Sequence, residues 1–178
     1  YYVILILEVF MKENLNYIIE FGQKILNIPS PSGYTFEVIK AIDDEAKSLG
    51  YSTTKTKKGN LIIDVEGESE EILGLSAHVD TLGAMVRSIT SDGQLKFTTI
   101  GGPIWPTLDG EYCTIKTRDS KEFTGTFLST SPSSHVYKKA GSETRNPDNM
   151  TVRIDEVVKN KDDVEKLGIR PGDFIFFD

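Results

Sequence analysis

Apolar residues in the first part of the chain follow a helical spacing and then a strand-like one. They recur every three or four residues in NLNYIIEFGQKIL (residues 14–26) and in TFEVIKAIDDEAKSLG (residues 35–50), which predicts two helices. The prolines of IPSPSG end the first helix, and Gly50 stands where a C-terminal cap belongs. YSTTKT, LIIDVEG and EEILGLSAHVD predict strands, the third apolar enough to be buried on both faces. Residues 11–81 therefore predict the opening of an α/β layered domain that needs further strands.

The second part, residues 82–178, has a different pattern. AMVRSIT, QLKFTTI, EYCTIKTR and KEFTGTFL alternate apolar and polar residues between short turns, which predicts an all-β meander. Residues 129–149 have almost no apolar pattern and predict a long surface loop. MTVRIDEVV predicts a strand, Asn160 and Gly168 mark the ends of a short helix, and a Pro-Gly turn leads into a final strand.

The first ten residues, YYVILILEVF, form an apolar run interrupted by Glu8. No basic flank and no small-residue cleavage site follows, so neither a secretion signal nor a membrane span is predicted. We expect residues 1–10 to be an extension ahead of the α/β domain or an additional edge strand.

The composition limits the classes of partner that we expect the protein to bind. The 178 residues are 38% hydrophobic and 26% charged, which is typical of a globular protein. The formal net charge of -7 disfavours nucleic acid and anionic membranes, because both require a basic surface. The single cysteine, Cys113, rules out an intrachain disulfide, favours a reducing cytoplasmic location and is expected to be an inert core thiol. The single tryptophan, Trp105, is expected to pack a loop or an interface rather than stack on a substrate.

Candidate chemistry is concentrated in LGLSAHVDTLGAMV, residues 73–86. On a strand, His78 and Asp80 would project from the same face where the strand ends, and strand ends are where ligand crevices form in α/β sheets. A neutral imidazole is a common zinc or cobalt ligand, and a nearby carboxylate can accept its other ring N–H. From spacing alone, however, a surface or hydrogen-bonded structural histidine is the commoner outcome.

SAHVDTLGAMV resembles the metal-ligand strand of the M42 family of dinuclear metallo-aminopeptidases, whose members are called glutamyl aminopeptidase, deblocking aminopeptidase or, in older usage, endoglucanase. IPSPSG, KKGNLI, SDGQLKFTTIGG and MTVRIDEVVKNKDDVEKLGIRPGDFIFFD resemble further family segments in the same order. The similarity covers about residues 12–178, and five ordered matches are more specific than any one motif.

The resemblance implies an α/β fold: part of a three-layer zinc-peptidase-like domain in residues 11–81, with an inserted barrel-like, PDZ-like dimerisation domain in residues 82–178. It implies hydrolysis of N-terminal residues from peptides with two divalent cations, zinc or cobalt, and a homo-oligomer formed through the β-rich insert. His78 matches the first metal ligand and Asp80 the carboxylate that positions it. Thr81 stands where many members carry a glutamate.

The family's other ligands and its general-base glutamate follow the inserted domain, whereas this sequence ends at Asp178. The other histidine, His135, matches no ligand position and is expected to be a surface residue. Catalytic zinc sites keep about three protein ligands, which one histidine with one carboxylate cannot supply. We therefore expect the chain to correspond to the N-terminal part of such an enzyme and to lack peptidase activity alone, and it need not hold either cation by itself.

Two other functions stay open at this point. KLGIRPGDFIFF is also similar to a turn of PDZ domains, which capture peptide ends by β-augmentation, so the β-rich part could be a peptide-binding module or a structural assembly domain. Polysaccharide hydrolysis ranks last, because no pair of acidic residues marks a sugar cleft.

Overall fold

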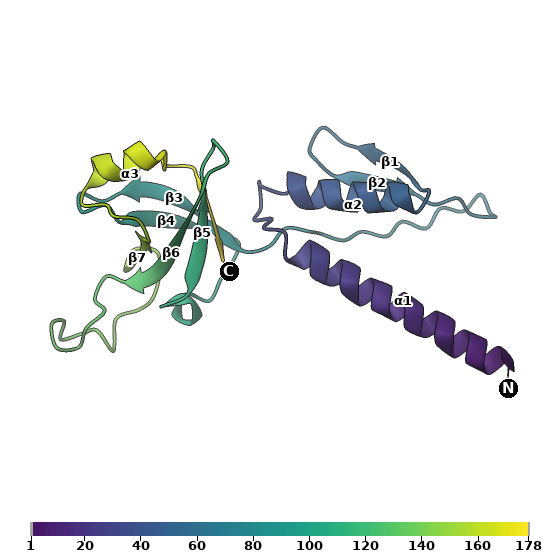
Figure 1. Cartoon of the computed structure of the whole chain (residues 1–178), viewed down its shortest axis with the longest axis horizontal. Coiled ribbons are helices and arrows are strands. Elements are labelled where there is room, and N and C mark those ends of the chain that lie inside the picture. Colours follow the sequence, from purple (N-terminus) through teal and green to yellow (C-terminus); the bar gives the residue numbers. More distant parts are fainter. Residues whose placement is uncertain (1, 178) are drawn as a thin grey trace. The chain divides into compact units, whose positions relative to one another are not determined.

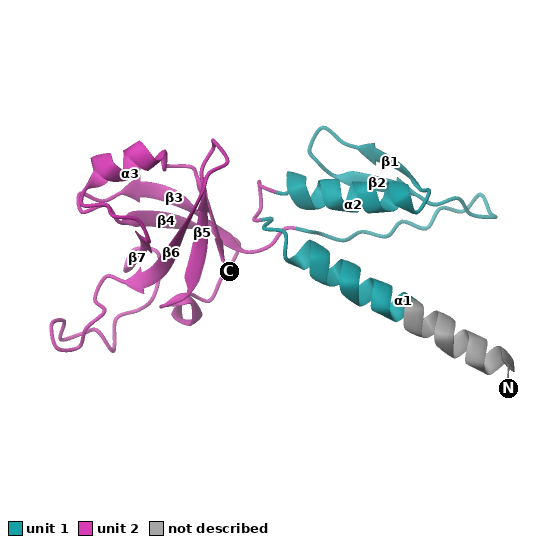
Figure 2. Cartoon of the chain, viewed as in Figure 1, with its two compact units in different colours: residues 1–30, 35–79 teal, residues 31–34, 80–178 magenta. Residues whose placement is uncertain are grey.

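The computed structural model describes the backbone of residues 2–177 and the side chains of residues 14–177. Its elements follow one another in this order (Figure 1): α1 (Tyr2–Leu26), α2 (Phe36–Ser48), β1 (Ser52–Lys55), β2 (Leu61–Asp64), β3 (Gly83–Ile89), β4 (Leu95–Ile100), η1 (Trp105–Leu108), β5 (Tyr112–Lys116), β6 (Glu122–Ser129), β7 (Met150–Ile154), α3 (Lys161–Leu167) and β8 (Phe174–Phe177). They divide into two compact units (Figure 2), which we call the α/β unit (residues 1–30 and 35–79) and the barrel unit (residues 31–34 and 80–178).

The α/β unit contains α1, α2 and a two-stranded antiparallel sheet in which β1 pairs with β2. Val38 and Ala46 are the buried apolar residues of α2. The helix ends as the sequence predicts: Gly50 follows the last turn with a φ of 87°, and its N–H donates to the Lys47 carbonyl. Among the described residues, no helix is apolar enough over a sufficient length to cross a membrane.

Two expectations for this unit are wrong. Residues 70–80 form no strand, and most of their apolar side chains are exposed, Ile72 at 96% and Leu75 at 91%. A buried strand needs hydrogen-bonding neighbours on both sides. The sheet that the structure describes in this unit contains only β1 and β2, and residues 70–80 pair with neither strand. The edge strand considered for residues 1–10 is also absent, because the backbone is helical from Tyr2 into the rest of α1.

The barrel unit is a closed barrel with the strand order β3-β4-β7-β6-β5-β8. All neighbouring strands are antiparallel. The expected strands are present, and the expected barrel-like architecture is confirmed. The expected meander is wrong, because β4 lies beside β7 rather than β5. The connection from β4 to β5, which contains η1, and the connection from β7 to β8, which contains α3, each join strands that are not neighbours.

The barrel interior contains the apolar halves of the alternating strands. Its buried core consists of Ala84, Val86, Ile89, Leu95, Phe97, Trp105, Cys113, Ile115, Phe127, Met150, Val152, Ile154, Val164, Ile169 and Ile175. Trp105 stacks obliquely on Phe97 at a centroid distance of 4.8 Å, and Phe127 meets Phe97 edge-on at 5.0 Å. Trp105 lies on η1 and is buried in this core. The expectation that Cys113 is a core thiol is confirmed.

Helix α3 shows the local signals that the sequence predicts. The Asn160 side chain accepts a hydrogen bond from the Asp163 N–H at 3.0 Å, and Gly168 closes the helix in the left-handed conformation. Val164 is its buried residue and joins the barrel core. The helix therefore completes the barrel unit rather than forming a separate element.

Candidate functional site

His78 is exposed and lies in an irregular segment of the α/β unit, not at the end of a strand as predicted. The His78 side chain is therefore accessible rather than packed in a hydrophobic interior. An imidazole must be accessible in this way to bind a metal ion. The boundary between the two compact units falls between Val79 and Asp80, so His78 and Asp80 belong to different units.

The segment that contains His78 and Asp80 is fastened to residues 30–32. In the α/β unit, the buried hydroxyl of Ser30 donates to the Val79 carbonyl at 2.8 Å. In the barrel unit, Pro31 and Thr81 form an isolated parallel bridge. Two segments that the sequence marked separately, IPSPSG and SAHVDT, thus lie side by side at each of these contacts.

Asp80 is exposed, and its Oδ2 accepts a hydrogen bond from the Ser32 hydroxyl. Ser32 is the partner that sequence reasoning missed. The available signal was IPSPSG itself, in which two serines alternate with prolines in a turn. Ser32 and Asp80 are 48 residues apart, so no local pattern in the sequence pairs them.

Gly83 sets how close the chain can pass to the same turn. A Cβ at this position would lie 2.7 Å from the Pro31 Cβ and 3.1 Å from the Ile175 carbonyl oxygen, closer than normal van der Waals contact. Only glycine therefore fits where β3 begins between Pro31 and β8. The glycine that interrupts the apolar run in the sequence is required by packing inside the barrel unit.

The described residues do not complete a metal centre. No group of three or more His, Cys, Asp and Glu side chains comes together within the part of the chain that the structure describes. Because a catalytic zinc ion needs about three protein ligands, His78 and Asp80 cannot hold one unaided. His135, as expected, is exposed in the loop between β6 and β7.

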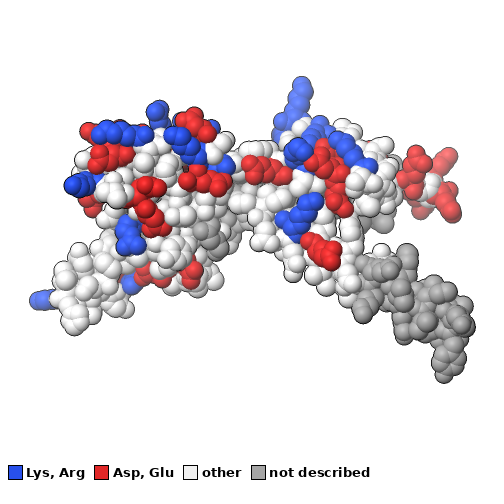
Figure 3. Space-filling model, viewed as in Figure 1, with Lys and Arg blue, Asp and Glu red and all other residues white. Residues whose placement is uncertain are grey.

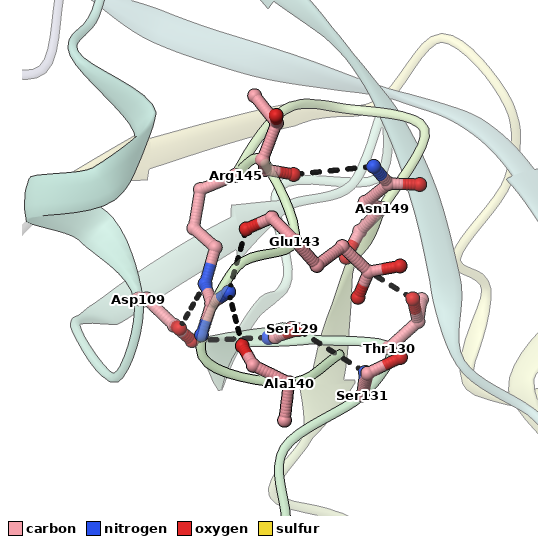
Figure 4. Close-up of polar contacts among 9 residues, drawn as sticks. Asp109, Ser129, Thr130, Ser131, Ala140, Glu143, Arg145 and Asn149 are labelled. Atoms are coloured by element: carbon pink, nitrogen blue, oxygen red, sulfur yellow. Dashed lines mark hydrogen bonds and ion pairs between the residues drawn. The ribbon is translucent and has the colours of Figure 1, made fainter. Parts of the chain in front are cut away.

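That loop, residues 130–149, is held to the barrel by Arg145 (Figure 4). Its guanidinium donates to the Asp109 carboxylate at 2.8 Å and to the carbonyls of Ala140 and Glu143. Asp109 in turn accepts the Ser129 N–H at 3.0 Å. The loop is a surface segment, as predicted. Its polar residues form a specific hydrogen-bond network, which the pattern of apolar and polar positions in the sequence does not predict.

Two buried carboxylates away from His78 have opposite electrostatic surroundings. In the α/β unit, the hydrogen bonds that Asp43 accepts from Lys55, Thr53 and Lys47 hold the pKa of its carboxyl far below the usual range. In the barrel unit, desolvation raises the pKa of the Asp173 carboxyl, although the Arg170 N–H and the Arg118 guanidinium oppose the shift. Both groups tie elements together, and neither is part of the candidate site.

The fold defines the class of protein. A TET aminopeptidase from the marine sediment archaeon Thaumarchaeota archaeon SCGC AB-539-E09 matches with a TM-score of 0.80 at 21% identity, over 92% of this chain and 45% of that one. At this identity the match shows a shared fold. The TET1 peptidase of Pyrococcus horikoshii, which is described as assembling into a tetrahedron or a large octahedral shell, matches with a TM-score of 0.73 at 27% identity, over 90% and 46% of the two chains.

The chain belongs to the M42 glutamyl aminopeptidase family, whose sequence model matches residues 59–178. YhfE of Bacillus subtilis strain 168, which carries the name "Putative aminopeptidase YhfE", is 46% identical over 160 residues, 89% of this chain and 46% of YhfE. The chain thus spans about half the length of the relatives that it matches. The expected family and fold class are confirmed. The range matched by the family model includes both the barrel strands and the segment that contains His78.

Proposed function

We propose that the full-length protein removes N-terminal residues from peptides, with two divalent cations, zinc or cobalt, as cofactors. The observation that carries this proposal is the family match across residues 59–178. The matched range contains His78, which is exposed and which we propose as the first metal ligand. Asp80 is the carboxylate proposed to orient that imidazole. We propose that the remaining metal ligands lie in polypeptide of the full-length protein that corresponds to the other half of its relatives.

The exposed apolar residues of the α/β unit support this division of the site. Ile72, Leu73 and Leu75 flank the proposed ligand on the N-terminal side, and each is at least 85% exposed. Apolar side chains arranged in sequence like a buried strand normally pair with further strands. We propose that residues 11–81 are the first part of the catalytic domain and that polypeptide from the other half covers this segment.

The test compares variants of the two histidines in the full-length protein. His78→Ala should abolish release of the N-terminal residue from a panel of aminoacyl p-nitroanilides assayed with zinc or cobalt. His135→Ala is the matched control and should retain activity, because that side chain lies in the exposed loop of the barrel unit. Full activity of His78→Ala would refute the assignment.

A second measurement uses the 178-residue chain by itself. It should release no N-terminal residue at any concentration of zinc or cobalt, because the residues that the structure describes do not complete a metal centre. Metal-dependent peptidase activity of this chain would show that the ligands lie elsewhere than proposed.

We propose a homo-oligomer in which the insert, residues 82–178, supplies the contact between copies. The assemblies described for the Pyrococcus horikoshii relative support an oligomer. Light scattering after size-exclusion chromatography would give the mass, and cross-linking with mass spectrometry would locate the contact. Intermolecular cross-links confined to the α/β unit would contradict the role of the insert.

Peptide is the proposed substrate partner, and nucleic acid and membranes are not proposed as partners. On the face drawn in Figure 3, acidic and basic side chains are interspersed over both units without a continuous basic surface. The single cysteine, Cys113, excludes an intrachain disulfide and supports a proposed cytoplasmic location, in which thiols stay reduced.

A further inference from the structure

Ser32 lies at the tip of a turn that is anchored on the barrel unit. The Tyr34 N–H donates to the Pro31 carbonyl at 2.7 Å, which closes the turn around Ser32 and Gly33. The Tyr34 ring packs against Phe174 and Phe176 with centroid distances of 5.1 and 5.2 Å. The position of the Ser32 backbone is therefore fixed by contacts outside the turn itself.

The residues that follow Asp80 contact this turn. Pro31 is buried, bridges to Thr81, and lies so close to Gly83 that no side chain fits there. With the chain fastened before and after Asp80, the Ser32 hydroxyl reaches Oδ2 of its carboxylate. Both partners are thus brought together by contacts that do not depend on their own hydrogen bond.

A carboxylate has two oxygens in one plane, so a hydrogen bond to one of them restricts rotation of the whole group. A hydroxyl held on Oδ2 therefore also sets the direction of Oδ1. Direction matters for a carboxylate that receives an imidazole N–H, because hydrogen bonds weaken steeply away from linearity. Partners of this kind orient metal-ligating histidines.

We propose that Ser32 is a positioning residue that sets the direction of the Asp80 carboxylate. The inference rests on the proposed function, in which Asp80 orients His78, but the hydrogen bond itself is testable without any activity. Ser30 offers a matched control, because it lies two residues before Ser32 and its hydroxyl donates to the Val79 backbone carbonyl instead of a carboxylate.

The first test uses the full 178-residue chain and the carboxyl carbon resonance of Asp80. In ¹³C NMR, Ser32→Ala should shift this resonance and abolish its isotope effect on exchange of the hydroxyl proton for deuterium. Ser32→Thr should retain both, and Ser30→Ala should change both less than Ser32→Ala does. Trp105 fluorescence, which reports on the barrel core, confirms that each variant is folded. An Asp80 resonance indifferent to Ser32→Ala would overturn the proposal.

The second test uses the full-length enzyme. Ser32→Ala should lower kcat by roughly 10-fold with little change in KM. This value is at the lower end of the range for losing a residue that orients a metal ligand, because Ser32 acts on His78 only through Asp80. Ser32→Thr should restore most of the rate, and Ser30→Ala should reduce it less. Equal loss in Ser32→Ala and Ser30→Ala, without rescue by threonine, would make Ser32 merely structural. An inactive wild-type enzyme whose Asp80 resonance still depends on Ser32 would instead refute the proposed function alone.

Discussion

The barrel unit and the α/β unit both contain strand-like apolar segments, but only the barrel unit buries them. Leu95 on β4 is fully buried among the core aromatics, whereas Leu75, in a segment of similar apolar content, is 91% exposed. The barrel closes on itself, so each of its strands has two neighbours. The sheet of the α/β unit has two strands in all and leaves two edges. Burial thus depends on the number of neighbouring strands as much as on the apolar residues themselves.

The largest expected effect is a difference between two identical substitutions. Leu95→Ala should lower the free energy of unfolding of the barrel unit by about 2–5 kcal/mol, because it leaves a cavity in a closed core. Leu75→Ala should change stability by less than about 0.5 kcal/mol, as expected for an exposed position. Urea unfolding followed by Trp105 fluorescence measures the first, and hydrogen exchange in the α/β unit measures the second. Similar values for the two would contradict the difference in packing.

Two glycines give a smaller version of the same contrast. An alanine Cβ at Gly125 on β6 would lie 2.8 Å from the Arg153 carbonyl oxygen and 2.9 Å from a Val152 methyl carbon, whereas nothing lies within 4 Å of that position at Gly74. Gly125→Ala should therefore destabilise the barrel unit by about 1–3 kcal/mol. The same urea titration measures this effect. Gly74→Ala should be close to neutral in hydrogen exchange of the α/β unit, and a destabilised Gly74→Ala would show that its segment is packed after all.

Helix capping should give a difference of about 1 kcal/mol. Asn160→Ala removes the side-chain cap of α3 and should destabilise the barrel unit by about that amount. Thr35 precedes α2 without a side-chain capping bond, so Thr35→Ala should have little effect on α2. Amide hydrogen exchange in the first turn of each helix is the measurement, and greater fraying of α2 than of α3 would contradict the assignment.

The two units should also respond oppositely to acid, as the smallest effect in this series. Asp43 has a lowered pKa in the folded state, so its contribution to stability is present above the ordinary value of 3.8 and is lost as the pH falls below it. Asp173 has a raised pKa, so its contribution is complete below 3.8 and is lost as the pH rises through the folded-state value. Acid should therefore weaken the α/β unit relative to the barrel unit.

Hydrogen exchange measured in both units from neutral pH to below 3.8 would detect this crossover. Asp43→Asn should remove part of the acid sensitivity of the α/β unit, and Asp173→Asn should remove part of the opposite trend in the barrel unit. An unchanged pH profile in both variants would mean that other groups dominate.

Much of the barrel unit was predictable because its signals are local. The alternation in β3 to β6 depends only on neighbouring residues, and the cap of α3 is read from Asn160 and Gly168. The strand order was not predictable, because pairing of β4 with β7 joins residues far apart in sequence, Leu95 with Val152. For the candidate site, the sequence identified His78 and Asp80 through the family resemblance but not Ser32.

By itself, the sequence determined most of the helices and short strands and the family, and it predicts His78 and Asp80 as the candidate site residues. Only the tertiary structure decided the order of the strands around the barrel, that Asp80 receives the Ser32 hydroxyl, and that residues 70–80 form no strand. The physical reason is that helix and strand periodicity record which side chains are apolar, whereas burial requires a partner surface. That partner depends on long-range hydrogen bonds and packing, which no local pattern contains.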